Sequence, residues 1–196
     1  MFPKITYHQL QKLGNTLIYL AENVSELNKT KVLKLLFLLE ESAVKKFGFP
    51  FLGLPFYVWK FGPVLKDVYV DLSEGSDLEL LGGYIQRTSY DPKLFEPKQP
   101  FNDDYFSDNE MTLLEQVAKF AKNKVANDLV NVTHEVDSLW YKTAQMNGVL
   151  EALENQHIPT TDFTIDFAML FENDPVRKEH YVESVENFEF IHQLKG

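Results

Sequence analysis

The five histidines are the residues to test first for metal or acid–base chemistry. His134 is followed by Glu135, but a zinc-binding helix of the H-E-x-x-H type needs a second histidine where Ser138 stands. The other histidines are scattered, and the chain has no cysteine to complete a metal site. We therefore expect no metal and no cofactor. The simpler interpretation of His134 is a side chain that bonds to the backbone and packs on Trp140, with a His134-dependent enzyme as the weakest alternative.

Nucleophilic and phosphate-binding motifs are also missing from the sequence. There is no thiol, no G-x-S-x-G elbow, and no glycine-rich loop of the Walker or G-x-G-x-x-G type. Carboxylate pairs such as Asp103 with Asp104, or Asp162 with Asp166, are typical of a solvated acidic surface. The sequence therefore favours a protein that binds another molecule over one that catalyses a reaction.

The charge of the chain is unevenly distributed. The net charge is −10, but residues 1–70 carry +4 and residues 71–196 carry −14. A protein that coats nucleic acid needs the opposite balance, so nucleic acid is not the expected main partner. One basic strip on a predicted helix keeps a DNA-binding autorepressor open as an alternative: Lys31, Lys34, Lys45 and Lys46. The competing interpretation is a set of long side chains that reach water from a half-buried helix.

Length and composition indicate one ordinary globular unit. The 196 residues are 44% apolar and include 16 Phe, 9 Tyr and 2 Trp, enough for a substantial core. No apolar run approaches the roughly 20 residues of a membrane span. The first residues lack the pattern of a signal peptide, so the sequence predicts a cytoplasmic protein without membrane contact.

Hydrophobic spacing predicts a mainly α fold around a central helix over about residues 28–47, with a small antiparallel β-ribbon. Gly48 follows Lys45 and Lys46, which is typical of a helix end. We expect residues 56–59 to form a strand that pairs with 84–88, and Pro63 to open a short helix that ends at Leu72. Residues 89–104 are expected to be a loop. Further helices are expected over residues 6–21, 110–122, 125–132 and 137–146, and from Asp174-Pro175 onward.

Several pieces of the chain resemble, in order and spacing, the Panacea domain family of SocA-like antitoxins and phage-associated proteins. The most specific piece is the W-x-x-G-P-V element, and the second is T-H-x5-W. The resemblance covers about residues 5–148 and rests on Lys34-Leu35-Leu36-Phe37-Leu38, Gly48-Phe49-Pro50-Phe51, Trp59-Lys60-Phe61-Gly62-Pro63-Val64, Val68-Tyr69, and Leu129 to His134 with Trp140.

The resemblance implies an antitoxin without catalysis of its own. Such a protein neutralises a cognate protein toxin, encoded by an adjacent gene, through direct binding, and a second route hands the toxin to a cytosolic protease. The family motif implies residues that act as scaffold or as partner contacts: Trp59, Gly62, Pro63, Val64, His134 and Trp140. Gly62-Pro63 would let the chain leave a strand within two residues, with Trp59 filling the space beneath that junction.

Residues 149–196 form an acidic helical extension to the Panacea-like domain at 1–148. We expect the extension to pack on or beside that domain and to carry a partner surface particular to this protein. The acidic residues proposed for this surface are Asp162, Asp166, Glu172, Glu183 and Glu186. An acidic rim beside exposed aromatic side chains would steer a basic partner, while the apolar groups supply affinity.

Overall fold

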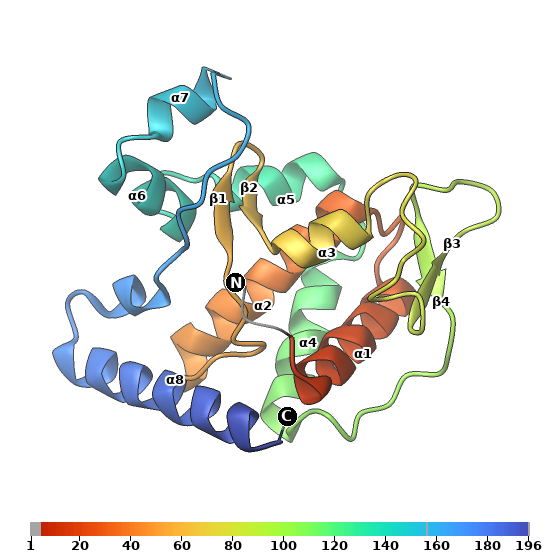
Figure 1. The fold of residues 1–196 in the computed structure, drawn as a ribbon, viewed down its shortest axis with the longest axis horizontal. Coiled ribbons are helices and arrows are strands. Elements are labelled where there is room, and N and C mark those ends of the chain that lie inside the picture. The colour runs from red at the N-terminus through yellow and green to blue at the C-terminus, as the bar shows by residue number, and fades with distance from the viewer. Residues whose placement is uncertain (1–4, 156, 196) are drawn as a thin grey trace.

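Helix α2 (Lys29–Phe47) runs through the middle of the molecule (Figure 1). The structure is a computed structural model and describes residues 5–155 and 157–195. The Oδ1 atom of Asn28 accepts from the Lys31 N–H at 3.0 Å and starts α2, and Gly48 ends it with φ at 73°. The expected central helix over 28–47 is therefore confirmed.

The remaining helices surround α2, which packs against α4 and α5 and against strand β2. The fold is mainly α with two small antiparallel strand pairs, as expected. In chain order the other helices are α1 (Tyr7–Asn23), α3 (Lys66–Asp71), α4 (Asp108–Ala121), α5 (Ala126–Thr133), α6 (Leu139–Met146), α7 (Leu150–Glu154), the 3-10 helix η1 (Phe167–Phe171) and α8 (Pro175–Lys195). Helix α7 was not expected from the sequence.

The strands pair differently from the prediction. β1 (Tyr57–Trp59) pairs with β2 (Gly62–Val64), and β3 (Ile85–Arg87) pairs with β4 (Phe95–Pro97). The predicted pairing of 56–59 with 84–88 is therefore wrong, and β4 lies within the predicted loop 89–104. The physical reason is Gly62, whose positive φ of 95° lets the chain reverse after two residues.

Pro63 belongs to β2 rather than to the first turn of a helix, which corrects a second expectation. It pairs with Val58 in the hairpin, and α3 begins only at Lys66. A proline is tolerated at this place because β2 pairs only with β1, so the other edge of β2 needs no N–H donor.

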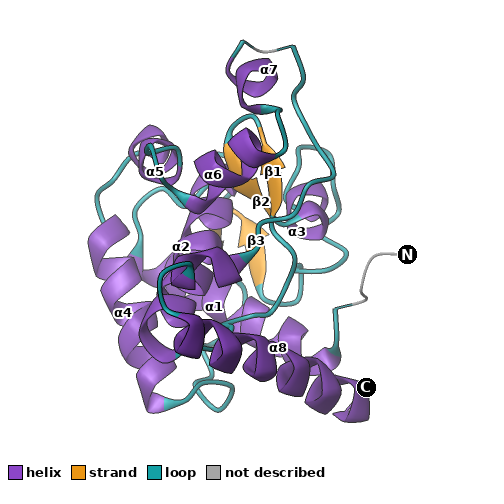
Figure 2. Ribbon diagram, turned by 90° about the vertical axis from the view of Figure 1, so that its left-hand side faces the viewer, coloured by secondary structure: helices purple, strands orange, loops and turns teal. Residues whose placement is uncertain are grey.

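The C-terminal part returns to the hairpin before it ends in α8. Phe163 O accepts from the Val58 N–H at 2.9 Å, and the Ile165 N–H donates to Phe56 O at 2.8 Å. Helix α8 then lies at the opposite end of the molecule from α7 (Figures 1 and 2). Asp174 caps α8 by accepting from the Arg177 N–H at 3.1 Å, as its position before Pro175 predicted.

Candidate functional site

Three side chains place a nitrogen atom within hydrogen-bond distance of backbone carbonyls of the β1–β2 hairpin. Trp140 Nε1 lies 2.9 Å from Trp59 O, and Lys34 Nζ lies 3.0 Å from Pro63 O. His134 Nε2 lies 3.0 Å from Lys60 O. These side chains come from α6, from α2 and from the residue that ends α5, so segments far apart in the sequence meet at one turn. We call Lys34, His134, Trp140 and the hairpin 59–63 the hairpin cluster.

Gly62 lies at the centre of the hairpin cluster, where no side chain fits. A Cβ atom at this position would lie 2.8 Å from Lys34 Nζ, 2.9 Å from Thr133 Oγ1 and 3.0 Å from His134 Cε1. These three residues therefore fill the space that we expected Trp59 to fill. The positive φ of Gly62 would strain any side chain there, and the crowding would require these neighbours to shift.

Trp59 instead lies half-buried at the side of the hairpin. Its ring packs edge-on against Tyr69 with 4.9 Å between ring centroids, and its Nε1 donates to Thr161 O at 3.1 Å. Thr161 in turn donates its hydroxyl to Val58 O at 2.6 Å. Trp59 thus connects the hairpin to the acidic extension rather than to the space beneath Gly62. Of the other motif residues, Pro63 and Val64 are buried in β2.

Both ring nitrogens of His134 face backbone carbonyls. Nδ1 lies 2.8 Å from Val130 O, Nε2 contacts Lys60 O, and the ring centroid lies 4.0 Å from that of Trp140. Burial lowers the pKa of His134, and nearby Lys34 acts in the same direction, while the two carbonyls oppose this shift. Neither nitrogen is open to a substrate, so this geometry gives a His134-dependent reaction no support.

Lys34 is a buried cation without a counterion. Its side chain is among the largest fully buried ones, and burial lowers its pKa to about 7. Within the part of the chain that the structure describes, no carboxylate forms an ion pair with it. The Pro63 carbonyl therefore supplies its polar contact, and Lys34 acts as a donor inside the fold.

The predicted basic strip on α2 does not form a surface. Lys31 is buried and donates to Ser25 O at 2.6 Å, and Lys34 is buried beneath the hairpin. Only Lys45 and Lys46, near the other end of α2, are exposed. The strip is wrong as a phosphate-binding face because packing directs half of its lysines into the protein, and the autorepressor alternative loses its structural basis.

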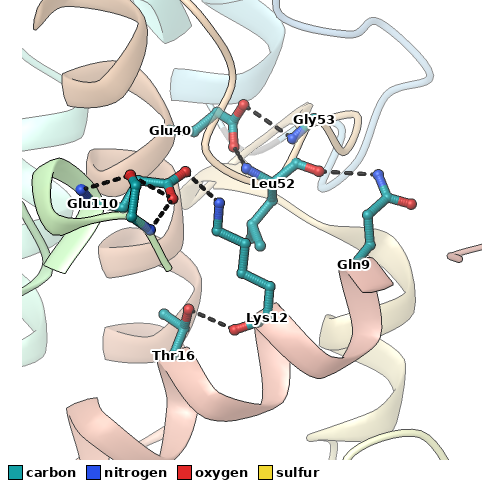
Figure 3. A network of polar contacts seen from close by, with 8 residues as sticks. Gln9, Lys12, Thr16, Glu40, Leu52, Gly53 and Glu110 are labelled. Atoms are coloured by element: carbon teal, nitrogen blue, oxygen red, sulfur yellow. Dashed lines mark hydrogen bonds and ion pairs between the residues drawn. The ribbon is translucent and has the colours of Figure 1, made fainter. Parts of the chain in front are cut away.

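A second buried polar cluster, which the sequence analysis did not single out, lies farther along α2 (Figure 3). Glu40 accepts from the Leu52 N–H at 2.7 Å and from the Gly53 N–H at 3.2 Å, and Gln9 Nε2 donates to Leu52 O at 3.0 Å. Burial raises the pKa of Glu40 to about 7, although the backbone N–H groups oppose the shift. We call Glu40, Gln9 and the loop 51–53 the loop cluster. The sequence contains one indication that Glu40 is buried, because it falls four residues after Leu36 on the apolar stripe of the helix.

The loop cluster borders a buried ion pair between α1 and α4. Lys12 Nζ contacts a carboxylate oxygen of Glu110 and lies 4.5 Å from the centre of the Phe51 ring. Glu110 also completes the predicted capping box, because its other oxygen accepts from the Ser107 N–H at 2.9 Å. The carboxylate thus serves a helix cap and a buried lysine together.

The five acidic residues predicted as a partner surface are all exposed. Asp162 is paired with Lys66 of α3 at 2.6 Å, and Glu172 lies 3.7 Å from Lys142. Asp166 caps η1 by accepting from the Ala168 N–H at 2.8 Å. Only two of the five line the same groove beside α8: Asp166 and Glu186. Glu183 lies exposed on α8 outside that groove.

The geometry defines a mainly helical protein in which buried donors hold a short hairpin. Among the described residues, no group of three or more His, Asp or Glu side chains is placed to hold a metal ion. No described helix combines the length and apolar character needed to cross a bilayer.

Comparison with known proteins identifies the family. The family model described as antitoxin SocA-like, Panacea domain, matches residues 32–141, more than half of the chain, so the protein belongs to the SocA-like Panacea family. The match runs from α2 into α6 and includes the whole hairpin cluster. No curated protein and no solved structure gives a significant match to the chain.

Proposed function

We propose that this protein is an antitoxin that neutralises a cognate protein toxin, encoded by an adjacent gene, by binding it directly. The observation that carries the proposal is the family match over residues 32–141. The geometry supports a binding role because both ring nitrogens of His134 face backbone carbonyls and are not open to a substrate. The protein acts in the cytoplasm, without a cofactor.

The motif residues serve this function as scaffold. Gly62, Pro63, Lys34 and Trp140 are buried, and within the hairpin cluster Lys34 donates to Pro63 O and Trp140 donates to Trp59 O. A partner reaches the exposed tip of the hairpin, where Phe61 is 64% exposed, but it does not reach these buried groups. Substitution of a buried motif residue should therefore reduce neutralisation through lost stability.

Co-expression with the product of the adjacent gene tests the proposal. We expect the adjacent gene alone to stop growth, the present chain to restore it, and the two proteins to co-purify. An absence of both rescue and co-purification would show that the proposed function is wrong.

Proteolytic delivery of the toxin is the second route that this function allows. A pulse-chase measurement of toxin half-life with and without the antitoxin distinguishes it from neutralisation by binding alone. A half-life that is shortened by the antitoxin and restored by deletion of a cytosolic protease supports delivery, and an unchanged half-life leaves binding as the whole mechanism.

A further inference from the structure

A groove of about 760 Å³ runs beside α8. One wall is α8, with Val182 and Glu186. The other walls are the loop that follows α2, which includes Leu54, and the segment that carries Asp166 and Phe167. The groove therefore joins the acidic extension to the family-matched region, and α8 itself lies outside residues 32–141.

Three contacts with the end of α2 and the loop after it set the position of α8. Arg177 donates to Lys45 O at 2.6 Å, and the Ser184 hydroxyl donates to Gly48 O at 2.9 Å. Phe188 packs so closely on Gly53 that a Cβ there would lie 2.4 Å from its ring. The spacing of residues 177, 184 and 188 follows one helix face, whereas Val182 and Glu186 lie four residues apart on an adjacent face. Arg177 and Ser184 hold α8 from outside the groove, whereas the Phe188–Gly53 contact lies in the groove lining.

The groove is apolar with negative charge at one side. Two exposed carboxylates, Asp166 and Glu186, line it together with the buried Glu40, and its described lining contains no lysine or arginine. Burial is the main cause of the raised pKa of Tyr181, and Glu40 and Asp166 add to that shift. Val182 is 43% exposed, so apolar surface in the groove remains open to solvent.

We propose that this groove docks the toxin, and that its occupant is an apolar toxin segment that carries at least one lysine or arginine facing Asp166 and Glu186. The inference rests on the proposed antitoxin function and adds the site and the chemistry of the bound segment. An apolar segment buries Val182 and Leu54, while the cation offsets the cost of removing the carboxylates from water.

Charge also selects between possible occupants. A second copy of this chain carries a net charge of −10, and a nucleic acid carries negatively charged phosphates. Both would place like charges beside Asp166 and Glu186, which opposes association. A segment of a partner protein with both apolar and basic side chains fits the apolar surface of the groove and the carboxylates beside it.

Two groove variants and one matched control test the proposal with the purified product of the adjacent gene. Glu186→Lys reverses a charge in the groove, and Val182→Asp places a charge on its apolar wall. Glu179→Lys makes the same charge change as Glu186→Lys at an exposed site on α8 outside the groove. By calorimetry we expect each groove variant to weaken binding by about tenfold or more, and the control by less than about twofold.

The outcomes separate this inference from the proposed function. If wild type binds and neutralises the toxin but both correctly folded groove variants bind equally well, the groove assignment is wrong and the antitoxin function stands. If wild type itself neither binds nor neutralises, both fall together. A dimer of wild type in light scattering that Glu186→Lys dissociates would make a second copy the occupant and would overturn the toxin assignment. Thermal melts of each variant verify that the fold is intact.

Discussion

Two buried ionisable side chains, one basic and one acidic, lie six residues apart on α2, and they bond to opposite kinds of backbone group. In the hairpin cluster, Lys34 donates to the Pro63 carbonyl, whereas in the loop cluster Glu40 accepts from the Leu52 and Gly53 N–H groups. Burial moves the pKa of both groups to about 7, from opposite directions. The comparison teaches that backbone dipoles can hold a buried ionisable group in place without cancelling the cost of its burial.

The two clusters also differ in what they fix. The hairpin cluster joins α2, α5 and α6 to one tight turn through three side-chain nitrogens. The loop cluster joins α1 and α2 to an irregular loop that α8 covers. The first therefore determines the shape of the family-matched region, and the second supports one wall of the proposed docking groove. Four predictions test this contrast.

The largest expected effect is at Trp140. Trp140→Ala removes a side chain that is 1% exposed together with its bond to Trp59 O, and we expect it to lower the free energy of unfolding by about 3–5 kcal/mol. Urea denaturation measures the loss. Trp140→Phe keeps most of the volume and should lose about 1–2 kcal/mol from the missing N–H donor. Equal stability of Trp140→Phe and wild type would mean that packing alone holds the hairpin.

Trp59→Ala is the companion variant, because Trp59 is only half-buried. The scaffold interpretation predicts a lower melting temperature and a parallel loss of neutralisation. An unchanged melting temperature with lost neutralisation would make Trp59 a contact residue for the toxin.

The next effect compares two glycines with positive φ. Gly62→Ala should cost about 2–4 kcal/mol, because strain at φ of 95° adds to crowding against Lys34, Thr133 and His134. Gly48→Ala has similar backbone strain but no atom within 4 Å of the added Cβ, so about 1 kcal/mol is expected. Chemical denaturation of both variants gives the difference. Equal losses would show that the hairpin cluster relaxes around a methyl group.

The third prediction concerns pH and separates the two clusters directly. Between pH 4.5 and about 7, native Glu40 holds a proton that the unfolded chain has released, so stability falls as pH rises. Between about 7 and 10.5, the unfolded chain binds a proton at Lys34 that the native state lacks, so stability rises with pH. These two groups therefore contribute a stability minimum near pH 7. His134 has a lowered pKa, so below pH 6.5 the unfolded chain binds a proton at this residue that the native state lacks. Its contribution therefore makes stability rise with pH in that range, opposite to that of Glu40.

Two variants assign the two limbs of this profile. Glu40→Gln should reduce the fall in the free energy of unfolding between pH 4.5 and 7. Lys34→Met should reduce its rise above pH 7. Each variant should change the free energy of unfolding by more than about 1 kcal/mol over its pH range. The measurement is the free energy of unfolding in urea at half-unit pH intervals. A Glu40→Gln profile parallel to wild type below pH 7 would show that Glu40 is not protonated in the native protein.

The smallest effect tests how the acidic extension attaches to the hairpin. Thr161→Val removes the hydroxyl that donates to Val58 O at 2.6 Å and keeps the side-chain shape, so a loss of about 1 kcal/mol is expected. Hydrogen exchange should show faster exchange at the Val58 and Lys60 amides, which bond to Phe163 O and Pro159 O. Unchanged exchange there would mean that the backbone pairs hold the extension without Thr161.

Much of the helical architecture was predictable because its signals are local. Asn28 and Gly48 bound α2, and Ser107 with Glu110 forms the expected capping box. A cap depends on residues three or four positions apart, so the sequence contains the whole interaction. The strand pairing failed because any short apolar strand can pair with several others, and a single glycine at position 62 decided the register.

The candidate sites were predicted less completely than the helices. Motif residues such as His134 and Trp140 were singled out from the sequence, but the carbonyls that they contact were not. Glu40 was overlooked because a glutamate in an apolar stripe looks like a helix-surface residue until the loop that supplies its two N–H donors is placed. Lys31 and Lys34 were taken as exposed for the same reason.

The sequence by itself determined that the chain is a mainly helical, cysteine-free member of the SocA-like family with an acidic second part, because composition, caps and motif spacing are properties of order along the chain. Only the tertiary structure decided which charges are buried, which strand pairs with β1, and which acidic residues share a groove. Those outcomes depend on backbone groups contributed by distant segments, and a side chain's type does not reveal whether such a partner will meet it.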